Sequence, residues 1–270
     1  MPDNTINSAS EKRGAFGASL FTAGFGGRRK QDCMEQLAII ALASWLAGIA
    51  AFIGGALAKA EGSAETEGKR ELIHGIVAFG GGMLLAAVAF ALAPEGLSTL
   101  SPVVLAATFC AGGLLICAFD VVISRRGGNK AQFMAMLLDF VPEAVALGAL
   151  FQHSRKTGLL LALFIGAQNL PEGFNAYREN MQTEGRSAKV FMLALLAVSL
   201  LGPIVACAGY LFLRDQPTVT ACIMSAAGGG ILYLVFQDIA PQSRMRRHWT
   251  PPLGAVMGFM VGMIGKQLFG

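Results

Sequence analysis

Two stretches near the middle of the chain decide the fold: Leu138-Asp139-Phe140-Val141-Pro142-Glu143-Ala144 and Ala167-Gln168-Asn169-Leu170-Pro171-Glu172-Gly173. Both lie inside long apolar runs, and each places a proline–glutamate pair near the middle of its run. An ionisable side chain in such a run is costly and usually marks a pathway or a binding site. The two stretches therefore predict two membrane-spanning helices that share a polar site.

The spacing of the polar residues points to a metal site. Asp139 and Glu143 are four residues apart, as are Gln168 and Glu172, so each pair lies on one face of its helix. Each proline lacks an N–H group, bends its helix and leaves the carbonyl four residues earlier without its helical donor. The carboxylates bring up to three negative charges into hydrocarbon, which requires a cation or protons to neutralise them. A site for a divalent metal follows.

The composition of the whole chain indicates a polytopic membrane protein. Of its 270 residues 54% are hydrophobic, and only 14% are charged, against about 25% in soluble domains. These values exclude an ordinary soluble domain, a disordered chain, a coiled coil and a collagen-like fibre. The net charge of +4 is spread over short clusters, which favours a role in membrane orientation and no binding to nucleic acid.

Eight apolar runs are long enough to cross a bilayer, since a span needs about 20 apolar residues. The runs cover residues 36–58, 72–93, 102–123, 131–152, 157–178, 188–213, 217–240 and 250–269. The alternation of apolar and polar residues that is typical of a transmembrane β-barrel is missing, and helices satisfy their own backbone groups in lipid. The expected fold is an all-α membrane protein with eight transmembrane helices over residues 36–270.

Residues 1–35 differ from the rest of the chain. They are rich in Gly, Ser, Asn and charged residues, and they lack the apolar core of a secretory signal peptide. We expect this segment to be a mobile N-terminal tail.

The distribution of Lys and Arg predicts the orientation of the chain. The first, third, fifth and seventh loops carry 12 of these residues, and the other three loops carry Arg155, Lys156 and Arg214. By the positive-inside rule the odd loops are cytoplasmic and both termini face outward. The cluster Arg28-Arg29-Lys30 argues for the opposite orientation, but the loop bias recurs four times along the chain.

Weaker copies of the proline–glutamate pattern occur in two other spans. Pro94-Glu95 ends the second span and Pro241-Gln242 ends the seventh. The second and seventh spans are equidistant from the middle of an eight-span chain, as are the fourth and fifth. Interrupted helices in symmetric positions suggest an inverted-repeat transporter with its binding site between the repeats.

These features resemble the ZIP (zinc/iron permease) family over nearly all of residues 36–270. The paired helices are the specific part, together with Gly81-Gly82-Met83-Leu84-Leu85 before Pro94 and Gly229-Gly230-Ile231-Leu232-Tyr233 before Asp238 and Pro241. The resemblance implies a 3+2+3 inverted-repeat bundle with outward termini, and it raises a homodimer as an expectation, because family members often pair. In that family the fourth and fifth helices together build a centre for two metal ions.

The departures from the family pattern fall mainly on the second of these metal positions. The resemblance implies that the first keeps Asp139, Glu143, Gln168 and Glu172 as oxygen ligands. The second would need donors at Phe140 and Gly202, which have none to offer, so only Asn169 and the shared glutamates remain. We therefore expect a single transport site with metal residues Asp139, Glu143, Gln168, Glu172 and Asn169. An all-oxygen site suits Mn²⁺ or Mg²⁺ better than a site that contains histidine does, and it also allows Fe²⁺ or Zn²⁺.

The expected function is transport of a divalent metal ion into the cytoplasm across the cell membrane (plasma or inner). The chain carries no phosphate-binding loop for ATP and no hydrolase motif, so we expect a transporter and not an enzyme, with the ion as cargo and no cofactor. Its expected partners are the metal ion and the lipid bilayer. The alternatives are a metal-sensing or structural membrane protein that has lost transport, and a transporter of organic solutes. Tail residues 1–35 have no assigned role.

Overall fold

The computed structural model describes residues 5–61, 66–126, 131–181, 187–213, 216–245 and 248–269. Within these ranges, the side chains of residues 5–31, 123–126, 131–136, 138, 139, 153, 179 and 269 are not described. Every regular element in the described residues is helical, and they contain no strand.

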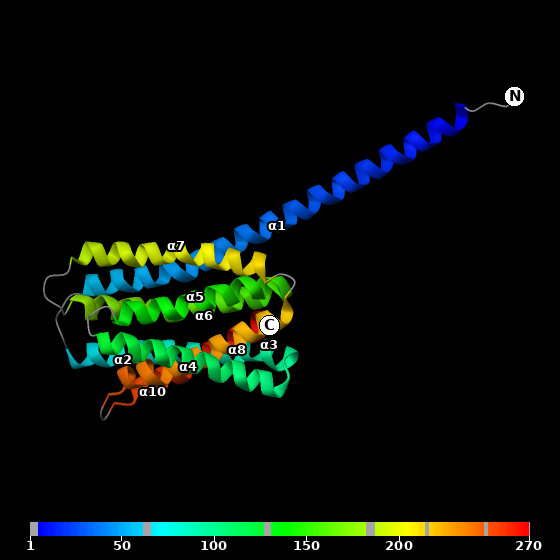
Figure 1. Cartoon of the computed structure of the whole chain (residues 1–270). Helices are drawn as coiled ribbons and strands as arrows, with labels where there is room; N and C mark the ends of the chain where they lie inside the picture. The colour runs from blue at the N-terminus through cyan, green and yellow to red at the C-terminus, as the bar shows by residue number, and fades with distance from the viewer. Residues whose placement is uncertain are drawn as a thin grey trace. The chain divides into compact units, whose positions relative to one another are not determined.

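The helices follow the predicted runs closely (Figure 1). Each of the eight runs lies within a helix, or within a series of consecutive helical segments, apart from one residue at the end of the sixth run. In chain order the elements are α1 (Thr5–Glu61), α2 (Glu67–Ala87), η1 (Val88–Leu92), α3 (Ala93–Thr99), α4 (Pro102–Arg126), α5 (Ala131–His153), α6 (Arg155–Met181), α7 (Ala188–Phe212), α8 (Pro217–Leu234), η2 (Val235–Ile239), α9 (Ala240–Ser243) and α10 (Thr250–Phe269).

Five helical segments are long and apolar enough to cross a membrane among the described residues. They are Asp32–Glu61, Glu67–Thr99, Pro102–Val122, Ala188–Phe212 and Pro217–Ser243. In α5 the described apolar part is the shorter stretch Phe140–Gln152. The chain is thus an all-helical protein of the membrane-embedded kind, as its composition predicts.

The chain divides into two compact units, Met1–Ile39 and Ile40–Gly270. This division lies four residues beyond the predicted end of the tail at residue 35. Because α1 begins at Thr5, the described part of the first unit is helical. The mobility expected for residues 1–35 stays a prediction.

Two short π-helical segments, η1 and η2, occupy matching places before the weaker proline motifs. At the end of each segment the backbone N–H donates to the carbonyl five residues back, from Ala93 to Val88 and from Ala240 to Val235. The next residue is a proline in each case, Pro94 and Pro241, which has no N–H to donate. A π-helical turn widens the helix by one residue per turn, and such turns occur frequently at functional sites.

Four pairs of helices in the second unit cross with their backbones in close contact. At each crossing both helices contribute a glycine. A Cβ atom added at either glycine would clash with a backbone carbonyl group of the partner helix. That carbonyl always belongs to the residue three positions before the partner's glycine. The pairs, each glycine with its opposing carbonyl, are Gly54 with Leu170 and Gly173 with Ala51 (α1–α6), Gly148 with Ala206 and Gly209 with Val145 (α5–α7), Gly82 with Ala255 and Gly258 with Phe79 (α2–α10), and Gly112 with Ala226 and Gly229 with Phe109 (α4–α8).

This packing holds the two central helices, α5 and α6, each against a different partner helix. Small residues let transmembrane backbones approach closely, and van der Waals contact then holds the helices together without a hydrophobic driving force. Helix α6 is fixed against α1, and α5 against α7, while α5 and α6 also contact each other. The two central helices are therefore held at a defined separation, which matters because they carry the polar residues of the predicted site.

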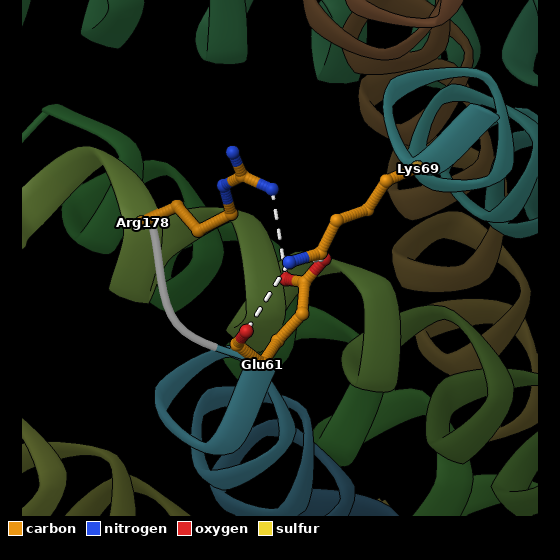
Figure 2. Close-up of polar contacts among 3 residues, drawn as sticks. All are labelled: Glu61, Lys69 and Arg178. Carbon is orange, nitrogen blue, oxygen red and sulfur yellow. Dashed lines mark hydrogen bonds and ion pairs between the residues drawn. The ribbon is translucent and has the colours of Figure 1, made fainter. Parts of the chain in front are cut away.

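An ion-pair hub joins the ends of three helices (Figure 2). The Glu61 carboxylate at the end of α1 lies 3.2 Å from Lys69 Nζ of α2 and 3.6 Å from Arg178 Nη1 of α6. Lys69 also donates to the Glu61 backbone carbonyl at 3.1 Å. The Arg178 guanidinium stacks over the Phe174 ring, 5.9 Å from its centroid. One carboxylate thus ties α1 to both α2 and α6.

Replacing Glu61 with glutamine is expected to lower the free energy of unfolding by about 1–2 kcal/mol, because two half-buried cations lose their shared partner. Unfolding in detergent micelles, followed by circular dichroism, measures the change. Glu67→Gln is the matched control, since Glu67 is 82% exposed and contacts only His248 among the described ion pairs. Equal stability of the two variants would show that the hub does not stabilise the fold.

Candidate functional site

Glu143 and Gln168 meet in the interior of the helix bundle. Glu143 lies on α5 immediately after Pro142, and Gln168 lies on α6 three residues before Pro171. Both side chains are only 1% exposed. Gln168 Nε2 donates to Glu143 Oε1 at 2.6 Å, which is a short distance and typical of a hydrogen bond to a charged acceptor. Two of the predicted metal residues, 25 positions apart in sequence, are therefore in direct contact.

The amide oxygen of Gln168, Oε1, is buried as well. It has no hydrogen-bond partner among the described residues. A buried polar atom of this kind calls for an explanation, such as a bound ion or water, because desolvating it costs free energy. The site thus offers a carboxylate and an amide oxygen on neighbouring helices.

Glu172 follows Gln168 by one helical turn and is half-buried. Between them Pro171 leaves the carbonyl of Ala167 without its helical donor. Helix α2 packs against this bend at Gly80, where a Cβ would lie 2.8 Å from Pro171 Cγ. A glycine of α2 therefore contacts α6 at the proline where a bend is expected.

Asp139 lies on α5 one turn before Glu143, as predicted, but its side chain is outside the described part of the structure. Its place in the site stays a prediction. Among the described residues, no group of three or more His, Cys, Asp or Glu side chains is arranged to hold a metal ion. The contact that the structure does supply is the one between Glu143 and Gln168.

Asn169 faces a different helix from Gln168. Its side chain is buried, and Asn169 Nδ2 donates to the carbonyl of Ala47 on α1 at 2.9 Å. Nearby on α1, Ser44 Oγ donates to the carbonyl of Ile40 at 2.7 Å. The described contact of Asn169 is thus a tie between α6 and α1, a common role for amides between membrane helices.

The Phe140 ring is buried between helices at a position where the family resemblance leads us to expect a metal donor. The side chain is 2% exposed and packs against two glycines from other helices. A Cβ at Gly202 of α7 would lie 2.8 Å from Phe140 Cζ, and one at Gly48 of α1 would lie 3.1 Å from the same atom. The aromatic ring and the two glycines are therefore complementary in volume, which the sequence pattern alone did not reveal.

Introducing a methyl group at this contact is expected to destabilise the protein. Gly202→Ala should lower the free energy of unfolding by about 1–3 kcal/mol, the usual cost of overpacking. Phe140→Leu in the same chain should recover part of that loss, because it removes the ring atom that the new methyl group meets. A double-mutant cycle of unfolding free energies checks this, and strictly additive effects would contradict the proposed contact.

Other polar contacts lie away from this site. Tyr233 of α8 donates to Asp120 Oδ2 of α4 at 2.9 Å. His248 contacts two glutamates of α2, with Nε2 3.4 Å from Glu67 and Nδ1 3.3 Å from Glu71. The Glu61 hub and this histidine contact were not foreseen from the sequence, because each joins residues at helix ends whose proximity no periodic pattern encodes.

Comparison with known proteins adds no relative to this description. No family model matches the chain, and no curated protein matches it. The functional interpretation therefore rests on the residues and contacts described above.

Proposed function

We propose that this protein transports divalent metal cations into the cytoplasm by alternating access, through a single carboxylate-rich site between α5 and α6, in the manner of the ZIP family that its sequence resembles. The observation that carries the proposal is the contact of Glu143 with Gln168 inside an apolar helix bundle. Ionisable residues at such depth are rare and usually mark an ion pathway.

The pair of side chains suits a cation. Turning the Gln168 amide about its last side-chain bond would exchange its nitrogen and oxygen, so that Oε1 faces the Glu143 carboxylate. Two oxygens facing each other at this separation repel unless a cation lies between them. Glu172, one turn farther along α6, would add a second carboxylate, and Asp139 a third. Hard divalent ions prefer such oxygen ligands.

A single site is favoured over two. The Phe140 ring fills the space beside Gly202 and Gly48, and Asn169 Nδ2 donates to the Ala47 carbonyl of α1. Phe140 and Gly202 then offer no donor to a second ion, and only the Asn169 amide oxygen remains beside the shared glutamates. Binding and release of the single ion would depend on Asp139, Glu143, Gln168, Glu172 and Asn169.

The helix crossings support an inverted repeat of eight spans. If the first three spans correspond to the last three, and the fourth to the fifth, the α1–α6 crossing corresponds to α7–α5, and α2–α10 to α8–α4. All four crossings use the same reciprocal arrangement of glycine and carbonyl. The π-helical turns η1 and η2 occupy equivalent places in the second and seventh spans. Rocking of one repeat against the other around a fixed site is the usual transport movement of such folds.

Uptake into proteoliposomes tests the proposal. The purified full chain is reconstituted in vesicles, and entry of Mn²⁺, Fe²⁺, Zn²⁺, Co²⁺, Cd²⁺ and Mg²⁺ is compared with protein-free vesicles. We expect saturable entry of at least one of these ions, with Mn²⁺ preferred to ions that favour softer ligands. Entry of an organic solute that ignores all six metals would favour the organic-solute alternative.

A metal-sensing or structural protein of the same fold is the second candidate. The observation in its favour is the loss of donors at Phe140 and Gly202, since a chain that no longer transports is free to lose ligands. Titration of the detergent-solubilised protein with Mn²⁺ separates the two candidates. Saturable binding without flux into proteoliposomes would identify the sensor.

A further inference from the structure

A groove lies between the last turns of α1 and the first turns of α7. Its volume is about 670 Å³, and its apolar lining includes Phe52 and Ala56 of α1 and Met192 and Leu193 of α7. Beside the groove, a Cβ at Gly55 of α1 would lie 2.7 Å from Leu195 Cδ1 and 3.3 Å from Met192 Sδ, so α1 and α7 are in contact there. The lining of the groove is therefore largely hydrocarbon in character.

Two lysines line the same groove. Lys59 comes two residues before the end of α1, and Lys189 is the second residue of α7. Both are exposed, and within the described residues neither forms an ion pair. The nearby carboxylate of Glu61 is engaged by Lys69 and Arg178. The mouth of the groove therefore presents two ammonium groups that no described carboxylate neutralises.

We propose that this groove binds one anionic phospholipid. Its acyl chain would lie along Phe52 and Met192, and its headgroup phosphate would sit between Lys59 and Lys189. The lysines belong to the loop ends that carry most of the Lys and Arg of the chain, and basic pockets between membrane helices on that side are typical sites for anionic headgroups. Lysine stems also cover apolar surface while the ammonium group stays at the interface. The proposal does not depend on what the protein transports.

A soluble anion fits the groove less well. A free phosphate would use the two lysines but leave the apolar lining exposed, whereas a phospholipid satisfies both parts of the groove at once. The apolar lining and the positive charge together therefore select an amphiphile with a negative head.

Native mass spectrometry of the full chain in detergent tests the site. Phosphatidylglycerol and phosphatidylcholine with identical acyl chains are titrated in parallel, and bound lipid is counted. We expect one phosphatidylglycerol to remain bound at higher collision energy than phosphatidylcholine. The double variant Lys59→Gln, Lys189→Gln should weaken this binding about 30-fold, since each basic residue near the headgroups contributes a factor of roughly five. The matched control is Arg155→Gln, Lys156→Gln, which removes two exposed basic residues outside the groove and should leave binding unchanged.

A second variant isolates the apolar part. Ala56→Phe fills the groove while keeping both lysines, and it should also abolish the tightly bound lipid. Inorganic phosphate at millimolar concentration should not displace the lipid. Equal binding of the two lipids, an equal loss in both double variants, or unchanged binding in folded Ala56→Phe would overturn the proposal.

Discussion

Replacing Glu143 with glutamine is expected to reduce metal uptake by at least about 100-fold. The change keeps the size of the buried side chain but removes the negative charge that would hold the cation. Since loss of an outer-shell partner alone typically costs 10–100-fold in affinity or activity, loss of a direct carboxylate ligand should cost at least as much. Initial rates of ion entry into proteoliposomes measure the effect, and Glu172→Gln is expected to act in the same direction.

Glu95→Gln provides the control for this experiment. Glu95 also follows a proline, in the short helix α3, and it is only half-buried. The structure places it on neither α5 nor α6, so uptake by this variant should stay within a factor of about two of the unaltered protein. If folded Glu143→Gln transported as fast as the Glu95→Gln control, the site would have to lie elsewhere.

Replacing Gly173 with alanine is expected to cause one of the largest losses of stability among single methyl additions. A Cβ at this position would strike the carbonyl group of Ala51 on α1. Backbone cannot move aside as a flexible side chain can, so the two helices would have to separate. We expect a loss of about 3 kcal/mol or more in the free energy of unfolding, at the upper end of overpacking effects.

Gly166→Ala is the matched control for Gly173→Ala. It lies on the same helix and faces the same neighbour, but a Cβ there would lie 3.5 Å from the Ala47 Cα atom, an ordinary contact. Alanine also has the higher helix propensity, by up to about 1 kcal/mol, so this variant should be neutral or slightly more stable. Unfolding in detergent micelles compares the two variants, and an equal loss in both would contradict the packing described for α1 and α6.

The sequence predicted the helices well because hydropathy acts locally. Each apolar run is bounded by charged residues or proline. The helices begin and end within a few residues of those boundaries, except that α1 begins at Thr5, well before the first run. The pairing of α5 with α6 also followed from sequence, because two similar polar motifs in neighbouring spans implied a common site. Glu143 and Gln168 are indeed in contact.

The contacts between distant segments could not be predicted in the same way. Phe140 was recognised as a position without a donor, but its packing against Gly48 and Gly202 depends on the separation of three helices. The glycines of the crossings can be read in the sequence. The carbonyl group that each glycine contacts belongs to a residue more than 20 positions away, and no local pattern identifies it. The engagement of Asn169 with the Ala47 carbonyl likewise depends on the close approach of α6 to α1.

Metal transport through the site between α5 and α6 is tested most directly by the initial rate of Mn²⁺ entry into proteoliposomes, measured side by side for the unaltered protein and for the double variant Glu143→Ala, Glu172→Ala. We expect saturable entry through the unaltered protein and entry no faster than in protein-free vesicles for the double variant. Folded protein that moves none of the six ions, or a double variant that moves them at the unaltered rate, would contradict this expectation.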